Sequence, residues 1–80
     1  MTKKEYHIVK HYIKSLCVDS IYELSSNVVL TEYETNLLVY INKNESRVGI
    51  ALRIGASESK VSKDLRKTFT KINDYLKRQD

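Results

Sequence analysis

Cationic and hydroxyl side chains gather in the last part of the chain at spacings that could hold an anion. Residues 46–80 contain nine Lys and Arg against four Asp and Glu, a net charge of +5, while the whole 80-residue chain carries +4. Ammonium and guanidinium groups donate charge-assisted hydrogen bonds to phosphate oxygens, and serine hydroxyls add neutral donors. The candidate contact residues are Ser46, Arg47, Ser57, Ser59, Lys60, Ser62, Lys63, Arg66, Lys67 and Lys71. This segment therefore favours phosphate as a ligand, with a solvated basic surface as the alternative.

No group of residues typical of an enzyme or a metal centre accompanies these cations. His7 and His11 are four residues apart, but no third ligand of suitable type follows on that helix face, so a metal site is not expected. Asp19 and Glu23 have the same spacing without a nucleophile beside them. Cys17 is the only cysteine, and we expect it to be buried on the apolar face of a helix. We therefore expect no catalytic residue, no metal and no cofactor.

The elements that position these residues are predicted to be helices, because the chain has no proline and only two glycines. Thr2 with Glu5, and Thr31 with Glu34, match capping boxes at two helix starts. Apolar residues then recur at steps of three and four, as on one helical face. The predicted helices span about 3–18, 21–25, 31–41, 46–54 and 58–78.

The connections between these helices are less regular. Asp19 or Ser20 is expected to cap the short second helix, and Ser25-Ser26-Asn27 to end it. Val28-Val29-Leu30 follows as either an extended link or a segment pressed on the core. Ser46 and Ser57 are expected to cap the last two helices.

The last two predicted helices have the spacing of a helix-turn-helix. Ala51 is small, as required where two helices cross closely, and Gly55 can adopt the positive φ of a sharp turn. Ile50, Ile54 and Val61, with Val48 and Leu65, are predicted to face inward. Such a pair presents the outer face of its second helix to a DNA major groove. An ordinary helical hairpin that does not touch DNA is the alternative.

Two stretches resemble known DNA-binding families. Leu30-Thr-Glu-Tyr-Glu34 resembles the opening of the LuxR/GerE-type tetrahelical domain, and Ile50-Ala-Leu-Arg-Ile-Gly-Ala-Ser-Glu-Ser-Lys-Val61 is similar to its Ile-Ala-x-x-Leu-x-Ile-Ser-x-x-Thr-Val signature. The same residues are also similar to the fourth-region domain of bacterial sigma factors, which the long basic last helix resembles more closely. The first family usually has arginine where Tyr33 stands, and both usually have a larger aliphatic residue at Ala56.

The resemblance covers residues 30–76 and implies one small all-α domain of four to five helices. A tetrahelical-type core would span 30–78, with an N-terminal helical extension over 1–29 and a long C-terminal recognition helix. The family and the composition together suggest a cytoplasmic, nucleoid-associated bacterial or phage regulator. No stretch approaches the length of a membrane span, and the residues after Lys3 and Lys4 lack the apolar run of a secretory signal.

The helix-turn-helix geometry assigns expected roles to the candidate residues. Lys60 and Lys63 are expected to contact bases, because a cation can donate to guanine O6 and N7, and Arg66 to contact a base or a phosphate. Lys67 and Lys71 lie further along the helix and are expected to touch phosphate. The start of the preceding helix, with Ser46, Arg47 and its free N–H groups, would hold another phosphate. Ser57, Ser59 and Ser62 lie beside them.

Besides double-stranded DNA, the sequence leaves two further partners open: a second copy of the chain, and RNA polymerase or a sigma factor. The stripe of Tyr6, Val9, Tyr12, Ile13 and Leu16 is expected to pack either on the same chain or on its copy in a homodimer. The alternative function is a sigma-like adaptor that binds RNA polymerase or a sigma factor, with Glu32, Glu34 and Glu45 as its acidic partner surface.

Overall fold

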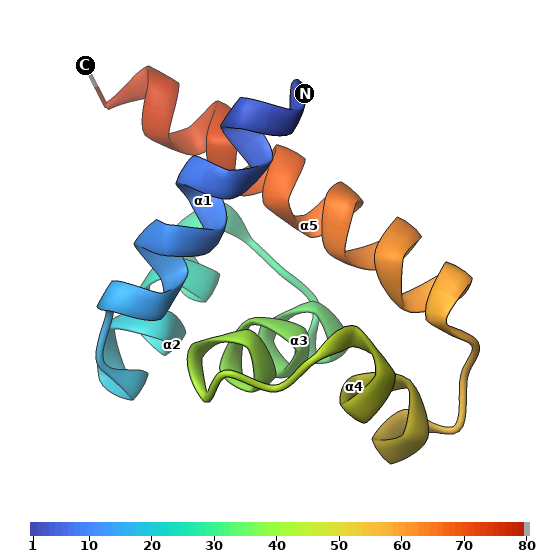
Figure 1. The fold of residues 1–80 in the computed structure, drawn as a ribbon. Coiled ribbons are helices and arrows are strands. Elements are labelled where there is room, and N and C mark those ends of the chain that lie inside the picture. The colour runs from blue at the N-terminus through green and yellow to red at the C-terminus, as the bar shows by residue number, and fades with distance from the viewer. Residues whose placement is uncertain (80) are drawn as a thin grey trace.

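The fold was analysed in a computed structural model that describes residues 1–79. Within that range the chain is all-helical and contains no strand (Figure 1). Its five helices are α1 (Lys3–Ser15), α2 (Val18–Val28), α3 (Glu32–Asn42), α4 (Arg47–Ile54) and α5 (Glu58–Arg78). The predicted all-α class is therefore confirmed.

The predicted caps begin four of the five helices. The Thr2 and Thr31 side chains accept hydrogen bonds from the backbone N–H groups of Glu5 and Glu34, and both glutamates return the bond as capping boxes do. The hydroxyls of Ser46 and Ser57 accept from the third residue of α4 and of α5. Each cap supplies an acceptor for a backbone N–H group that has no partner within the helix.

The first connection differs from the prediction, because α1 ends at Ser15 and not near residue 18. The backbone turns to an extended conformation at Leu16, and the carbonyl oxygens of Ile13 and Leu16 accept hydrogen bonds from the Asn42 side chain at 2.9 and 2.6 Å. Asn42 lies at the end of α3, so a distant residue satisfies the end of α1. Cys17 therefore falls in the connection, where it is exposed and forms the N-cap of α2, and the prediction that it is buried is wrong.

The second helix is longer than predicted at both ends. It begins after Cys17, so neither Asp19 nor Ser20 is its cap. It also continues through Ser25-Ser26-Asn27, where a break was expected. The reason is tertiary: Ser25 is buried against α3, and its hydroxyl hydrogen bonds to that of Thr35. A serine whose hydroxyl has a partner does not have to leave the helix to satisfy it.

Val29 and Val48 differ from their predicted environments, because both side chains are exposed. Val29 is neither an extended link nor a core residue: it ends α2 in the left-handed region at φ 61°, with 81% of its surface exposed. A β-branched residue rarely adopts that conformation. Val48 was predicted to face inward, but it is 49% exposed, because the buried side of α4 is formed by Ile50 and Ala51.

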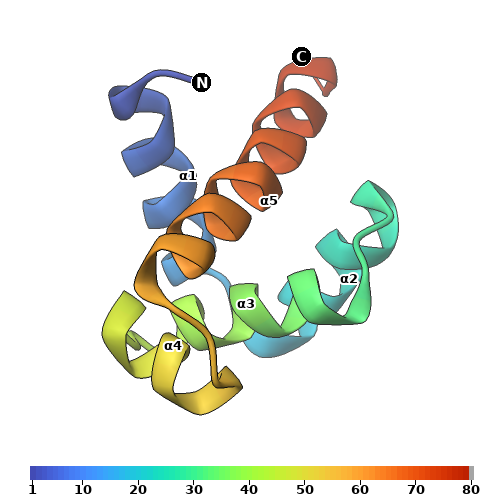
Figure 2. The same cartoon turned by 90° about the vertical axis from the view of Figure 1, so that its right-hand side faces the viewer.

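All five helices share one apolar core. α3 packs against α1, α2 and α5, while α1 lies across α3 and α5 (Figure 2). The residues 1–29 are thus part of the same core as the rest of the chain. The core is formed by Val9, Ile13, Ile21, Leu24, Leu37, Leu38, Ile41, Ile50, Ala51, Val61, Leu65, Phe69 and Ile72.

Candidate nucleic-acid interface

The connection between α4 and α5 is a short turn with a fixed backbone. Gly55 has φ 68° and ψ 38°, and the N–H of Ala56 donates to the carbonyl of Ala51 at 3.0 Å. The Ser57 hydroxyl then accepts from the N–H of Lys60 at 3.1 Å and begins α5. A β-carbon at Gly55 would meet no atom within 4 Å, so glycine is needed there for its backbone conformation and not for space.

Packing holds α4 against the first turns of α5. Ile50 and Ala51 are buried on α4, and Val61 and Leu65 are buried on α5, as their spacing predicted. Ile54 is partly buried against the same core. The start of α5 is therefore braced on one side only, which leaves its opposite side in solvent.

Three cations on that open side of α5 have no salt-bridge partner among residues 1–79. Lys63, Arg66 and Lys67 are exposed and form no ion pair within the described range. At 100° per residue Lys63 lies opposite the buried stripe of Val61, Leu65 and the residues that follow. Ser59 is exposed one turn before Lys63. These four residues form the free face of α5.

Lys60 lies at one edge of that face and is already paired. Its ammonium group is 2.8 Å from a carboxylate oxygen of Asp64 and 5.4 Å from the ring centroid of Tyr33. The Tyr33 hydroxyl donates to the same carboxylate at 2.6 Å. The hydrogen bonds from Lys60 and Tyr33 lower the pKa of Asp64, while partial burial and the bond to Asp64 raise the pKa of Tyr33 to about 12. Lys60 therefore helps to join α5 to α3.

Lys71 has a similar role further along the helix. Its ammonium group lies 2.9 and 3.0 Å from the two carboxylate oxygens of Glu34, which is buried at the start of α3. Burial opposes the ionisation of Glu34, but the hydrogen bonds from Thr31 and Lys71 outweigh it and lower the pKa of the carboxyl. The structure thus gives Lys71 an intrachain partner, and its contact with phosphate stays a prediction.

The start of α4 brings the other candidates beside α5. The Ser46 hydroxyl is used as the cap, accepting from the N–H of Gly49 at 3.1 Å. Arg47 extends toward α5 and donates from Nη1 to the Ser62 hydroxyl at 2.9 Å. Arg47 and Ser62 therefore lie on the edge of α5 opposite to Lys60.

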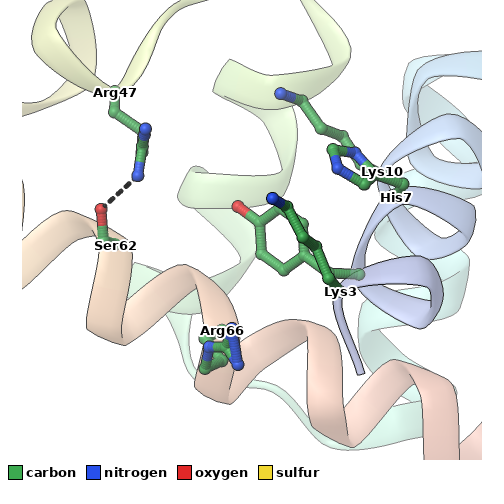
Figure 3. Close-up of a pocket in the computed structure, with 7 residues that line it drawn as sticks. Lys3, His7, Lys10, Arg47, Ser62 and Arg66 are labelled. Carbon is green, nitrogen blue, oxygen red and sulfur yellow. Dashed lines mark hydrogen bonds between the residues drawn. The ribbon is translucent and has the colours of Figure 1, made fainter. Parts of the chain in front are cut away.

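A hollow of about 310 Å³ lies next to this pair, between α1 and the start of α5 (Figure 3). Four of its lining residues come from α1: Lys3, Tyr6, His7 and Lys10. The close-up shows Arg47 directed at Ser62 and the lysines extending from α1 beside the same space. Sequence reasoning missed these α1 residues as site candidates. Their only signal was their common face on the helix, since nothing local indicates that this face meets α5.

The acidic residues do not form the free surface that the adaptor hypothesis uses. Glu34 is buried and paired with Lys71, and Glu45 accepts a hydrogen bond from Arg53 Nε at 3.1 Å. Only Glu32 of the three lacks an ion pair within residues 1–79.

Within residues 1–79, no three or more His, Cys, Asp or Glu side chains are grouped so that they could hold a metal ion. None of the helices described is long and apolar enough to cross a membrane.

Comparison with known proteins adds no relative: no protein-family model, no curated protein and no solved structure matches this chain.

Proposed function

We propose that this protein is a sequence-specific DNA-binding transcriptional regulator in which α4 and α5 form a helix-turn-helix. The observation that carries the proposal is the exposed cationic face at the start of α5, formed by Ser59, Lys63, Arg66 and Lys67. A helix of this diameter fits the major groove, and its first turns approach the base edges. The fixed turn at Gly55 supports the proposal, because base readout requires a helix held at one angle.

The contacts divide into base readout and backbone positioning. Lys63 lies opposite the buried stripe and is the side chain best placed to reach a base, with Arg66 one turn further along. We assign Lys67, Arg47 and the N–H groups at the start of α4 to phosphate contacts, because such contacts set the position of a protein on the duplex. Lys60 and Lys71 are already paired with carboxylates. They can contact phosphate either while they keep these partners or by exchanging them for the phosphate.

Selection of bound duplexes from a random pool tests this function directly. We expect an enriched site that the protein binds at least about 10³-fold more tightly than scrambled duplex at physiological salt. Equal retention of enriched and scrambled duplexes would contradict sequence-specific recognition. Loss of all retention at physiological salt would contradict DNA binding by the isolated chain.

A second candidate function is protein contact with RNA polymerase or a sigma factor. The observation that favours it is an apolar pair on the outer side of α4, where Leu52 is 80% and Val48 is 49% exposed, one turn apart. A mobility-shift assay with and without polymerase separates the two functions. Duplex retention by the chain alone supports the regulator, and retention that requires polymerase supports the adaptor. In the second case Leu52→Ser would abolish the effect of polymerase, while it would leave direct DNA binding unchanged in the first.

A further inference from the structure

The hollow between α1 and α5 is lined by positive charge from three helices. Lys3 and Lys10 come from α1, Arg47 from the start of α4 and Arg66 from the third turn of α5 (Figure 3). No carboxylate is among the lining residues, which also include Tyr6, His7 and Ser62. Glu5, the acidic residue of α1, does not line the hollow, and its carboxylate is paired with Lys77. We call this hollow the α1–α5 groove.

The cations of the groove are not neutralised within the described part of the chain. None of Lys3, Lys10, Arg47 and Arg66 takes part in an ion pair among residues 1–79. On α5, Lys60 and Lys71 form ion pairs, whereas Lys63 and Lys67 share the unpaired state of Arg66 within residues 1–79. Four like charges around one hollow repel one another, and an anion that enters it removes that repulsion.

We infer that the α1–α5 groove binds a backbone phosphate of the DNA that α5 contacts. This inference rests on the proposed function. The groove is continuous with the proposed interface, because Arg66 belongs to the free face of α5 and Arg47 lies at the start of α4. Ser62 holds Arg47 in place through its hydrogen bond at 2.9 Å, so one guanidinium is already oriented along the edge of the groove.

The consequence is a footprint wider than a helix-turn-helix alone would give. A strand that leaves the major groove beside Arg47 and Ser62 would pass next to Lys3 and Lys10 of α1. Helix α1 then serves two purposes: its apolar side completes the core, and its basic side holds the flanking phosphate. Phosphate contacts of this kind set the register of the protein on the duplex without reading its sequence.

The test compares two double variants that each remove two positive charges. Lys3→Ala/Lys10→Ala removes the two lysine charges on the α1 side of the groove. The control, Lys4→Ala/Arg78→Ala, removes two exposed cations outside the groove. Binding to enriched and scrambled duplexes is measured at several salt concentrations. We expect the groove variant to lose about tenfold in affinity for both duplexes and to flatten the salt slope by about 1, since each phosphate contact contributes about 0.9 to that slope. The control variant keeps the wild-type slope.

The outcomes separate this inference from the proposed function. If the wild type binds duplex and the groove variant weakens no more than the control variant, the groove does not hold a phosphate of the DNA and only this inference fails. If the wild type retains no duplex, the proposed function fails and this inference with it. Circular dichroism verifies that each variant folds, and Lys3→Gln/Lys10→Gln, which removes the charge but keeps most of the side chain, replaces the alanine pair if that pair loses helicity.

Discussion

Individual cations of α5 differ in what they are free to bind. Lys60 and Lys71 are paired with Asp64 and Glu34, whereas Lys63 has no ion-pair partner among residues 1–79. A paired ammonium group must release its carboxylate before it can bind a new ligand fully, so the loss of that ion pair reduces the free energy gained on binding. A free and exposed group has no such cost. The free cations should therefore dominate any contact that α5 makes.

Lys63→Ala tests the free face at the level of one side chain. We expect it to weaken binding to the enriched duplex by about 1–3 kcal/mol and to relax the preference at one base position, because a base contact is lost. Arg66→Ala should have a similar cost if it contacts a base. Equilibrium binding to the enriched duplex and to its single-base variants measures both effects.

Lys67→Ala and Lys4→Ala serve as matched comparisons. Lys67 is expected to touch phosphate, so its loss should weaken binding to all duplexes alike and reduce the salt slope by about 1. Lys4 lies on α1 outside the groove, and its removal should change neither quantity. Unchanged affinity in the Lys63, Arg66 and Lys67 variants together would remove this face of α5 from DNA binding.

At the level of elements, the turn between α4 and α5 depends on one backbone conformation. Gly55 is in the left-handed region, while Gly49 is an ordinary residue in the first turn of α4. A β-carbon at Gly49 would lie 3.4 Å from the Ser46 hydroxyl, which is a normal van der Waals contact. The two glycines therefore differ in what their replacement by alanine does.

Alanine substitution at the two glycines should change stability in opposite directions. We expect Gly55→Ala to lower the free energy of unfolding by about 1 kcal/mol through backbone strain, and Gly49→Ala to raise it by about 0.5–1 kcal/mol through helix propensity. Urea denaturation followed by circular dichroism measures both. Gly55→Asn should cost less than Gly55→Ala, because asparagine tolerates the left-handed region better. If Gly55→Ala and Gly55→Asn lowered the free energy of unfolding equally, the cause would be steric and not the backbone conformation.

At the level of the whole molecule, Glu5 joins the beginning of the fold to its end. Its carboxylate caps α1, lies 2.9 Å from the Lys77 ammonium group and accepts a hydrogen bond from Asn73 at 3.2 Å. The Thr2 backbone N–H, then Lys77 and Asn73, lower the pKa of Glu5 from its ordinary value of 4.5 to about 2. Folding therefore favours the ionised form of this side chain.

Acid should weaken the fold through Glu5 in a defined pH range. Because its pKa is lower in the folded chain, its contribution is complete above pH 4.5 and is lost as the pH falls toward about 2. We expect Glu5→Gln to show a smaller loss of stability over that range than the wild type, as measured by urea midpoints. Glu23→Gln, which removes an exposed carboxylate with no ion pair in residues 1–79, should follow the wild-type curve. Parallel curves for all three proteins would contradict this role of Glu5.

The packing of α1 also bears on the oligomeric state. Val9 and Ile13 are fully buried within the chain, and the Tyr6 ring packs at a tilt against Phe69 with ring centroids 4.9 Å apart. Of the two alternatives that the sequence left open for this stripe, the structure shows packing on the same chain, so the stripe by itself does not require a homodimer. We predict that the free chain sediments at micromolar concentration as a monomer of 9.3 kDa. A species of twice that mass would contradict the prediction and require a contact outside the stripe.

Much of the helical framework could be predicted because its signals are local. Each cap joins residues three positions apart, as in Thr2 with Glu5 and Ser57 with Lys60, so the sequence contains both partners within one turn. The buried stripe of α5 follows from its three- and four-residue period in the same way. The glycine at the turn after α4 is likewise a local requirement of the backbone.

Only the tertiary structure decided which polar groups are free. Lys71 and Glu34 are 37 residues apart, Asn42 satisfies the end of α1 from 26 and 29 residues away, and Ser25 stays in α2 because Thr35 reaches it. The same is true of the α1–α5 groove, where α1 begins more than 40 residues before the α4 and α5 helices that supply the other cations. Local patterns determine where a helix begins and which side it buries. What its polar side meets depends on how the helices pack, and that is set by the shape of the shared core.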